Sequence, residues 1–231
     1  IITVGNKEAR CLGGDDRCGI LCLLAMIKAN IPGTYIFHSG EECGGIGSQY
    51  ILDNIDLTRF KRAIEFDRMD KHAVIAAMGF GIRCASDEFA LELADRLGEG
   101  FEPDYTGLFT DTFVYKDKIP ECVNLSVGYF NAHSKSESID AAWLIDVLIP
   151  KIISIDWETL PVFRNDLDKE ECVFDRVEQC FTDGYGKTWS LCDRCGEPLD
   201  GLGKAQSIFD NLCDACYTRV SNELKIIIPN L

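Results

Sequence analysis

Two pairs of adjacent carboxylates are the residues of this sequence best suited to chemistry. Asp15-Asp16 stands at the start of an apolar run, and Glu41-Glu42 follows the apolar residues 34–37. Neighbouring carboxylates at the end of a buried strand repel each other and lose hydration, so they need a compensating partner. A metal ion combined with a proton-transfer task is one such compensation. The sequence therefore predicts a metal site with acid–base chemistry.

An alternation of helical and strand patterns is expected to position these carboxylates. The apolar periodicity predicts helices at 16–29, near 47–54, 87–97 and 136–147, and strands at 34–37, 62–66, 73–78, 107–109 and 122–127. This alternation is typical of an α/β three-layer sandwich with a mostly parallel central sheet. Ligands of such sheets bind at the carboxyl ends of the strands, and Asp15, Glu41, Glu42 and Asp67 all fall where a strand ends.

The helix at 16–29 has a distinctive pattern. It is apolar almost all round, which predicts a buried helix rather than an amphipathic one. Asp15 or Asp16 is expected to cap its N-terminus, because an aspartate oxygen can accept a hydrogen bond from a free backbone N–H of the first turn.

Composition excludes several classes of protein. The formal net charge of −15 argues against a nucleic-acid partner, which would require Lys and Arg. No stretch of eighteen uncharged apolar residues is present, so we expect no membrane partner. The first residues do not read as a signal peptide, and with twelve cysteines this favours a reducing, cytoplasmic location. The chain opens in mid-strand without Met, which predicts that a preceding part is not included.

Four cysteines have the spacing of metal ligands. Cys192 and Cys195 form one Cys-x-x-Cys pair, and Cys213 and Cys216 form a second pair, with seventeen residues between the two pairs. Four thiolates so spaced can close a tetrahedron on one structural zinc, as in a zinc ribbon or treble clef. The other eight are interpreted as small buried hydrophobic residues: Cys11, Cys18, Cys22, Cys43, Cys84, Cys122, Cys172 and Cys180.

The two carboxylate motifs resemble those of the co-catalytic zinc peptidase superfamily, which includes leucyl-type zinc aminopeptidases, peptidase T and glutamyl aminopeptidases. Residues 13–19 match the family pattern Gly-x-Asp-Asp-x-x-Gly, and residues 41–44 match Glu-Glu-x-Gly. The resemblance implies that Asp15 bridges two metals, that Glu42 is a terminal ligand and that Glu41 is the general base acting on a metal-bound water.

Two later segments extend the resemblance, which spans roughly residues 5–154. Asp67 fits the family's strand-end aspartate, and residues 123–133 resemble the segment that brings the last ligand, His133. The Thr110-Asp111 pair resembles an element that lines the site. The interval from Asp67 to Asp111 leaves no room for the separate domain of peptidase T, so the compact aminopeptidase architecture is the better match.

One metal ligand that the family pattern contains has no counterpart in this sequence. The family has an early His-x-Asp motif, whose histidine binds the second metal, but no histidine of this chain precedes Asp15. Three explanations remain open: a preceding segment carries that histidine, His38 or His72 replaces it, or the second site is lost. The complete site would hold two catalytic divalent metals, zinc first and cobalt or manganese as alternatives.

These observations divide the chain into three parts. Residues 1–155 are expected to form a metallopeptidase-like domain, 156–187 an acidic connector and 188–231 the zinc module. The expected function is hydrolysis of peptide substrates as an aminopeptidase. The alternatives are a degenerate peptidase fold that binds a peptide or protein, and an N-acyl amino acid deacylase of the same superfamily. Oligomerisation is left open.

Overall fold

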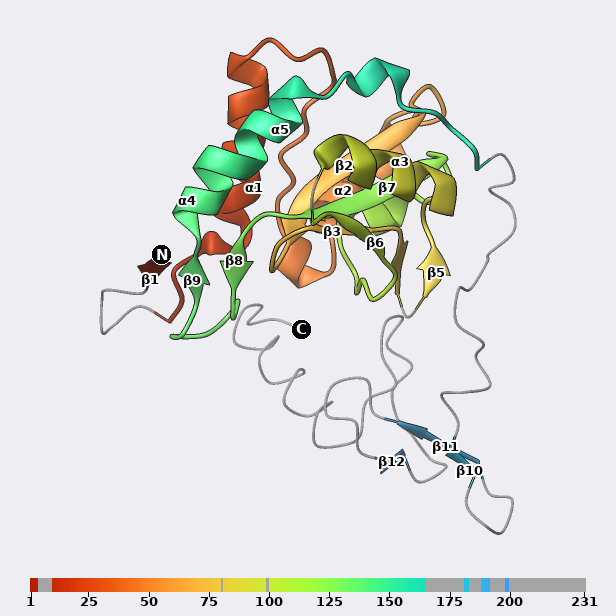
Figure 1. Cartoon of the computed structure of the whole chain (residues 1–231). Coiled ribbons are helices and arrows are strands. Elements are labelled where there is room, and N and C mark those ends of the chain that lie inside the picture. The colour runs from red at the N-terminus through yellow and green to blue at the C-terminus, as the bar shows by residue number, and fades with distance from the viewer. Residues whose placement is uncertain are drawn as a thin grey trace. The chain divides into compact units, whose positions relative to one another are not determined.

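The computed structural model describes residues 1–3, 10–79, 81–98 and 100–164, and the backbone of three short strands at 181–182, 188–191 and 198–199. The chain divides into two compact units, residues 1–173 and 174–231. The first unit is an α/β domain, drawn in Figure 1. Its elements are β1 (Ile2–Thr3), α1 (Gly14–Lys28), η1 (Glu41–Cys43), α2 (Ile46–Asn54), β2 (Arg62–Arg68), β3 (Ala73–Ile75), β4 (Ala77–Met78), β5 (Ile82–Arg83), α3 (Asp87–Leu97), β6 (Glu102–Asp104), η2 (Asp111–Tyr115), β7 (Glu121–Ser126), β8 (Tyr129–Phe130), β9 (Ser138–Ile139), α4 (Ala141–Trp143), η3 (Leu144–Leu148), α5 (Ile149–Ser154) and η4 (Trp157–Thr159).

A four-stranded mixed sheet forms the centre of this unit. Its strand order is β2-β7-β3-β6, with β2 and β6 at its edges among the described strands. The pairs β2–β7 and β3–β6 are parallel, and β3–β7 is antiparallel. The general α/β class expected from the alternating pattern is confirmed. β7 is fully buried along its length, as expected of a strand covered on both faces.

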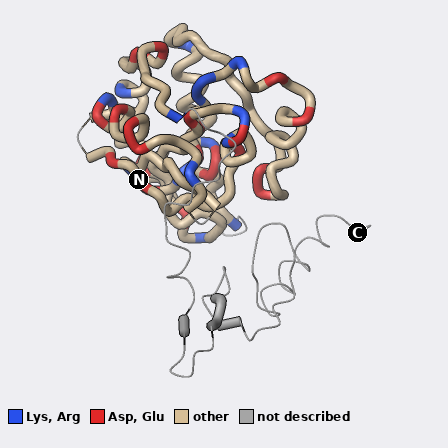
Figure 2. Tube along the Cα trace, turned by 90° about the vertical axis from the view of Figure 1, so that its right-hand side faces the viewer, with Lys and Arg blue, Asp and Glu red and all other residues tan. Residues whose placement is uncertain are grey.

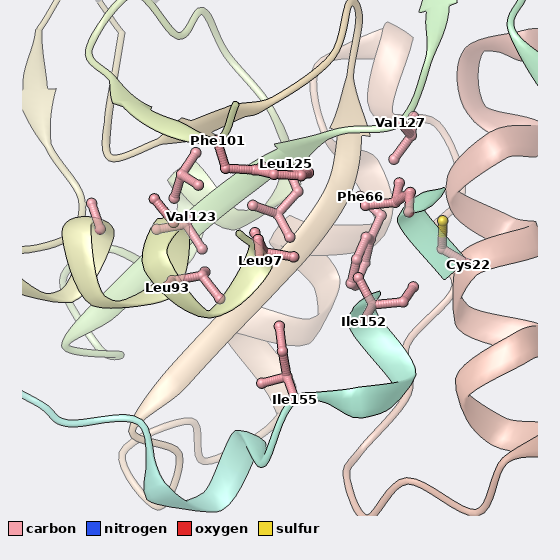
Figure 3. Close-up of a cluster of buried hydrophobic side chains, with 14 of the residues drawn as sticks. Cys22, Phe66, Leu93, Leu97, Phe101, Val123, Leu125, Val127, Ile152 and Ile155 are labelled. Carbon is pink, nitrogen blue, oxygen red and sulfur yellow. The ribbon is translucent and has the colours of Figure 1, made fainter. Parts of the chain in front are cut away.

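Successive residues of the central strands pack into two different apolar clusters. Val74 and Val123 belong to a cluster with α1, α3 and α5, whereas their neighbours Ile75 and Cys122 belong to one with α2 and η2. Because side chains alternate between the faces of a strand, helical segments cover both faces of the sheet. Figure 3 shows the first cluster, with Leu93 and Leu97 near the strand residues Val123 and Leu125.

The helix α3 is predicted most closely by the sequence. Its bounds agree with the expected 87–97, and its inward residues Phe89, Ala90, Leu93, Ala94 and Leu97 are all buried. Ser86 caps it by accepting a hydrogen bond from the Phe89 N–H. Each fully buried Leu or Phe side chain stabilises the fold by about 1.5–3 kcal/mol.

Three elements expected from the sequence differ from those in the structure. Residues 34–37 and 107–109 form no strand. The expected helix at 136–147 begins only at Ala141, because Ser138 and Ile139 pair in a strand with β1 and β8. The helical segment then continues as a π-turn, η3, into α5, where Pro150 lacks the N–H that a regular α-helical ladder needs.

The apolar helix α1 exists but is not buried all round. Cys18, Cys22 and Met26 face the core, while Ile20 and Leu24 are 44% and 51% exposed. The expectation of a fully buried helix is therefore wrong, because α1 packs against β2 and, as Figure 1 also shows, beside α5, which leaves one side uncovered.

The expected connector begins as part of the first unit. Leu160 is buried in the apolar core. The Arg62 guanidinium donates to the Leu160 carbonyl oxygen at 2.6 Å, and the backbone N–H groups of Phe163 and Arg164 donate to the carboxylate of the buried Glu121 at 2.8 and 2.9 Å. Residues 156–164 thus pack on the domain rather than leaving it.

The second unit is described only through β10 (Phe181–Thr182), β11 (Thr188–Leu191) and β12 (Pro198–Leu199), which form an antiparallel sheet. Cys192, Cys195, Cys213 and Cys216 lie outside the described residues, as do Cys172 and Cys180. In the first unit, Cys18, Cys22, Cys84 and Cys122 are buried as expected. Cys11 and Cys43 are exposed, so the interpretation as buried hydrophobic residues is wrong for these two.

Candidate metal centre

Residues 12–16, which include the non-helical start of α1 and are called the Asp15 loop below, place the two aspartates near β2. Asp15 and Asp16 have non-helical backbone angles and are joined by a cis peptide bond. Asp16 Oδ1 accepts a hydrogen bond from the Gly19 N–H at 2.9 Å, so the regular helix begins after Asp16. The expected cap at Asp15 or Asp16 is confirmed, and Asp16 provides it. Only glycine fits at position 19, because a Cβ there would lie 1.8 Å from the Phe66 carbonyl oxygen of β2.

A buried glutamate holds this loop in place. The Glu137 carboxylate accepts hydrogen bonds from the N–H groups of Leu12, Gly13, Gly14 and Asp15, the last three at 2.8, 2.6 and 3.2 Å. Burial raises the pKa of Glu137, but the four N–H donors outweigh it, so the pKa lies below the ordinary value. Glu137 is only 1% exposed, and it fixes the backbone on which Asp15 is carried.

Three side chains from distant parts of the sequence meet beside this loop. His133 Nε2 lies 2.7 Å from Asp15 Oδ2 and 2.9 Å from Glu42 Oε1. One ligand atom of each residue lies within 4.8 Å of those of the other two. Glu42 is carried by η1 and His133 by the loop after β8, where its backbone has a φ of 61°. The group comprises three of the four ligands expected from the sequence.

The donor set suits a divalent cation. Two carboxylate oxygens and one imidazole nitrogen are ligands of zinc, and catalytic zinc sites hold three protein ligands and leave a further position open. The side chains of His133 and Glu42 are each 58% exposed, so such a position is reachable from solvent. Burial lowers the pKa of His133, but the hydrogen bond to Asp15 and the charge of Glu42 outweigh it and leave the pKa raised.

Further carboxylates lie behind this group. Burial, followed by the charge of Asp16, raises the pKa of Asp67 to about 11. Burial also raises the pKa of Asp16 to about 8, against the hydrogen bond from Gly19, and that of Glu41 to about 8 with help from the charge of Glu42. Glu65, which accepts from the Thr112 hydroxyl at 2.6 Å, also has a raised pKa because of burial. Without a cation, Asp16, Glu41 and Asp67 favour the protonated form near neutral pH.

This cluster predicts that the metal-free protein loses stability as the pH rises. An acid whose pKa is raised on folding contributes stability that is present below its unfolded pKa, near 4, and lost as the pH rises through its folded pKa. For Asp16 and Glu41 the loss therefore occurs between about pH 4 and 8, and for Asp67 it continues to about 11. Urea unfolding in chelator at about pH 5.5 and about pH 8.5 should show the lower free energy at the higher pH.

The matched control for this pH dependence is Asp67→Asn, which keeps the shape of the side chain and removes one titrating group. Its free energy of unfolding should fall less between the two pH values than that of the wild type. Zinc should also reduce the fall, because a cation stabilises the ionised carboxylates. Equal pH dependence in the wild type, Asp67→Asn and the zinc-loaded protein would contradict the assignment.

The histidines considered for the second metal position are engaged elsewhere. His38 Nδ1 lies 2.9 Å from Asp111 Oδ2, and His38 Nε2 lies 2.6 Å from the Tyr115 hydroxyl. His72 packs edge-on against Phe101 and Trp143 and accepts a hydrogen bond from the Trp143 indole N–H at 3.2 Å. Both ring nitrogens of His38 are thus occupied, and His72 belongs to an aromatic cluster. Among the described residues, neither histidine belongs to the group of Asp15, Glu42 and His133.

The structure places the other expected site residues as follows. Asp67 lies among the acidic neighbours of the site but is not a member of the three-ligand group. Its carbonyl oxygen and carboxylate accept from the Tyr129 hydroxyl at 3.3 and 3.4 Å. Asp111, which the resemblance puts along the site, is 5% exposed, and its Oδ1 has no hydrogen-bond partner in the part of the chain that the structure describes. All four cysteines expected to hold structural zinc lie outside the described residues.

A cavity of about 660 Å³ adjoins these carboxylates. Asp15, Asp16, Glu41, Glu65 and Asp67 line one part of it. The remaining lining comes mainly from α1, residues 32–38, β2 and η2. Asp15 and Glu42 of the candidate metal centre therefore border a space large enough for a small ligand.

Sequence reasoning missed two parts of the site. Glu137 contacts the loop of Asp15 across 122 residues of chain, and no local pattern marks it. His38 likewise contacts Asp111 and Tyr115, each more than seventy positions away in the sequence. The only available signal was the placement of His38 and Asp111 near the motifs that carry the resemblance.

No protein-family model, curated protein or solved structure gives a significant match to the chain. Among the described residues, no helix combines the length and apolarity that crossing a membrane requires. Lys and Arg positions are interspersed with Asp and Glu positions in the first unit, as Figure 2 shows. The case for a function rests on the site itself and on the resemblance of its motifs.

Proposed function

We propose that this protein is a metal-dependent hydrolase that cleaves peptide bonds, with an aminopeptidase as the first candidate. The observation that carries the proposal is the convergence of Asp15, Glu42 and His133, with Glu41 adjacent in the sequence. The motifs that carry these three residues, at 13–19, 41–44 and 123–133, also follow one another in the order that the resemblance implies. The compact peptidase-like sandwich and a zinc module at residues 188–231 belong to the same proposal.

The proposed chemistry assigns a separate task to each side chain. When bound by Asp15, Glu42 and His133, a divalent cation would polarise a carbonyl and increase the acidity of water. The Glu41 carboxylate accepts a proton from the attacking water as its oxygen bonds to the carbonyl carbon. Glu41 then passes that proton to the amine nitrogen as the carbon–nitrogen bond breaks. Before any cation is bound, burial and the charge of Glu42 raise the pKa of Glu41 to about 8. A bound cation would lower this pKa and favour the carboxylate form that accepts a proton.

A hydrolysis assay before and after metal removal tests the proposal. The full chain, stripped with chelator, should cleave amino acid arylamides only after zinc, cobalt or manganese is restored. A requirement for a free amino group would identify an aminopeptidase, and cleavage of N-acyl amino acids would identify a deacylase. Undiminished activity in chelator would contradict metal dependence.

A second candidate is a catalytically degenerate peptidase fold that binds a peptide or protein. The observation that favours it is the engagement of His38 and His72 away from Asp15, which leaves the second metal position without an imidazole among the described residues. Metal binding without hydrolysis of any of the tested substrates would support this candidate over the enzyme.

A further inference from the structure

His72, which the proposed function does not use, belongs to a small aromatic cluster. Its Nε2 accepts a hydrogen bond from the Trp143 indole N–H at 3.2 Å. The imidazole also packs edge-on against the rings of Phe101 and Trp143, with ring centroids 5.1 and 5.3 Å away. Trp143 is 8% exposed, and a buried indole N–H needs an acceptor. The neutral imidazole of His72 supplies that acceptor.

The surrounding backbone keeps the His72 ring in this position. His72 has a left-handed φ of 71°, which histidine adopts more readily than most residues do. The Glu102 N–H donates to the His72 carbonyl oxygen at 2.9 Å. Gly100 lies against the imidazole, where a Cβ would come within 3.3 Å of His72 Cγ. The ring is therefore confined between its own turn and residues 100–102, and it stays directed at Trp143.

Trp143 fastens the base of the hairpin formed by β8 and β9. Its ring packs on Gly128, where a Cβ would lie 2.8 Å from Trp143 Cε3. The Asp140 N–H donates to the Gly128 carbonyl oxygen at 2.9 Å, and Asp140 Oδ1 accepts from the Trp143 backbone N–H at 3.1 Å. The loop between β8 and β9 carries His133 and Glu137. The position of Trp143 therefore affects the segment on which the candidate metal centre depends.

Two ammonium groups face the aromatic cluster. Lys71 Nζ lies 5.6 Å from the centroid of the Trp143 ring, and Lys151 Nζ lies 5.9 Å from that of the Phe101 ring. Burial first, and then the charges of Lys71 and Lys151, lower the pKa of His72 below its ordinary value. A third positive charge in this cluster is therefore unfavourable.

The acids on the surrounding elements offset these charges only weakly. Asp140, at the start of α4, is already paired with Lys71, at 2.5 Å between Asp140 Oδ2 and Lys71 Nζ. The side chains of Asp70, in the turn that carries His72, and of Glu102 in β6 are exposed. Water and salt screen the charges of such exposed side chains.

We propose that His72 and Trp143 form a pH-sensitive latch that fastens the base of the β8–β9 hairpin. A proton that binds His72 Nε2 turns this acceptor into a donor, so the Trp143 indole N–H loses its partner. The imidazolium is also repelled by Lys71 and Lys151. The hairpin base then loosens, without any change in the protonation of a metal ligand. The inference is independent of whether the protein hydrolyses peptides.

The latch opens on the acid side of neutrality. Because folding lowers the pKa of His72, the stability that the latch contributes is present above the unfolded pKa, near 6.5. It is lost as the pH falls through the lower pKa of the folded protein. Histidine is the side chain whose ordinary pKa suits such a switch.

An NMR titration of the full chain in chelator, from about pH 8 to about pH 4.5, tests the latch directly. The His72 ring and the Trp143 indole N–H should shift with one common midpoint, with the indole proton moving upfield as its hydrogen bond is lost. Trp143→Phe assigns the indole signal. The Trp157 indole N–H is the matched control, because it donates to the Ile152 carbonyl oxygen at 2.9 Å and should not follow that midpoint. A Trp143 signal that does not follow His72 would overturn the proposal.

Hydrogen exchange in chelator tests the effect on the hairpin. Between about pH 7.5 and about pH 5, the protection of the Gly128 and Asp140 amides, corrected for intrinsic exchange rates, should fall by about two- to tenfold, the equivalent of one hydrogen bond. His72→Gln should show no fall, because its amide oxygen accepts the Trp143 bond at either pH. His133→Ala should keep the fall, since His133 is not part of the latch. A fall that persists in His72→Gln, or that disappears in His133→Ala, would overturn the proposal.

Discussion

Glu41→Gln should lower the rate of peptide hydrolysis by about 10²–10⁴-fold, the usual contribution of a positioned general base. The amide keeps the size of the side chain but cannot accept and return a proton at its carboxylate oxygen. Because Glu41 is not a member of the Asp15–Glu42–His133 group, the bound zinc should be retained. The loss should therefore appear in kcat, measured by arylamide hydrolysis alongside zinc content.

The control for this substitution is Glu88→Gln. Glu88 is an exposed acid in the first turn of α3, away from the candidate site, and its replacement should leave both hydrolysis and zinc content unchanged. A Glu41→Gln protein with full activity would remove Glu41 from its proposed role. A variant that also lost its zinc would assign Glu41 to metal binding instead.

Glu137→Ala should lower the free energy of unfolding by about 3–5 kcal/mol, as expected when one side of a buried, charged hydrogen-bonding arrangement is removed. Four backbone N–H groups of residues 12–15 would lose their acceptor, of which that of Gly14 is buried and the other three are partly buried. A donor that is left unpaired away from water is costly. This is a large share of the 5–15 kcal/mol typical of a whole domain. Urea unfolding monitored by circular dichroism measures it.

Two further variants separate the role of Glu137 from a general effect of acid removal. Glu92→Ala breaks a partly exposed pair with Arg96 on α3 and should cost only about 0.2–1 kcal/mol. Glu137→Gln should remain strongly destabilised, because its amide group turns a donor toward backbone donors. If Glu137→Gln were as stable as the wild type, the carboxylate would not be the anchor of the Asp15 loop.

The sequence predicted best those parts of the fold that local patterns determine. The period of apolar residues in α3 specifies which side faces the core, and Ser86 marks where the helix starts. Likewise the apolar run at Arg62–Phe66 became β2, although the strand extends two residues further to Arg68. These features depend on residues only a few positions apart.

Features that depend on distant partners were predicted less well. Residues 34–37 have the apolar composition of a strand, but a strand requires a neighbour with which to pair, and none of the described strands provides it. The apolar pattern of α1 predicted burial, yet Ile20 and Leu24 remain partly exposed because only one side of the helix meets the sheet and α5. Periodicity shows that a face is apolar but not what covers it.

Some residues of the candidate site were predicted from the sequence and others were not. Asp15, Glu42 and His133 were expected together because their motifs follow one another in a recognisable order, and the structure brings them within ligand distance. Asp67 was expected as a fourth ligand but lies outside that group. Glu137 and the pairing of His38 with Asp111 depend on the folded loops, so no spacing in the sequence indicated them.

A count of bound zinc shows whether Asp15, Glu42 and His133 bind a divalent metal. After dialysis against zinc and removal of the excess, the full chain should hold about two ions, one at this group and one in the four-cysteine module. His133→Ala and Asp15→Asn should each hold about one fewer, with circular dichroism confirming that both remain folded. The same zinc content in the wild type and in both variants would contradict the claim.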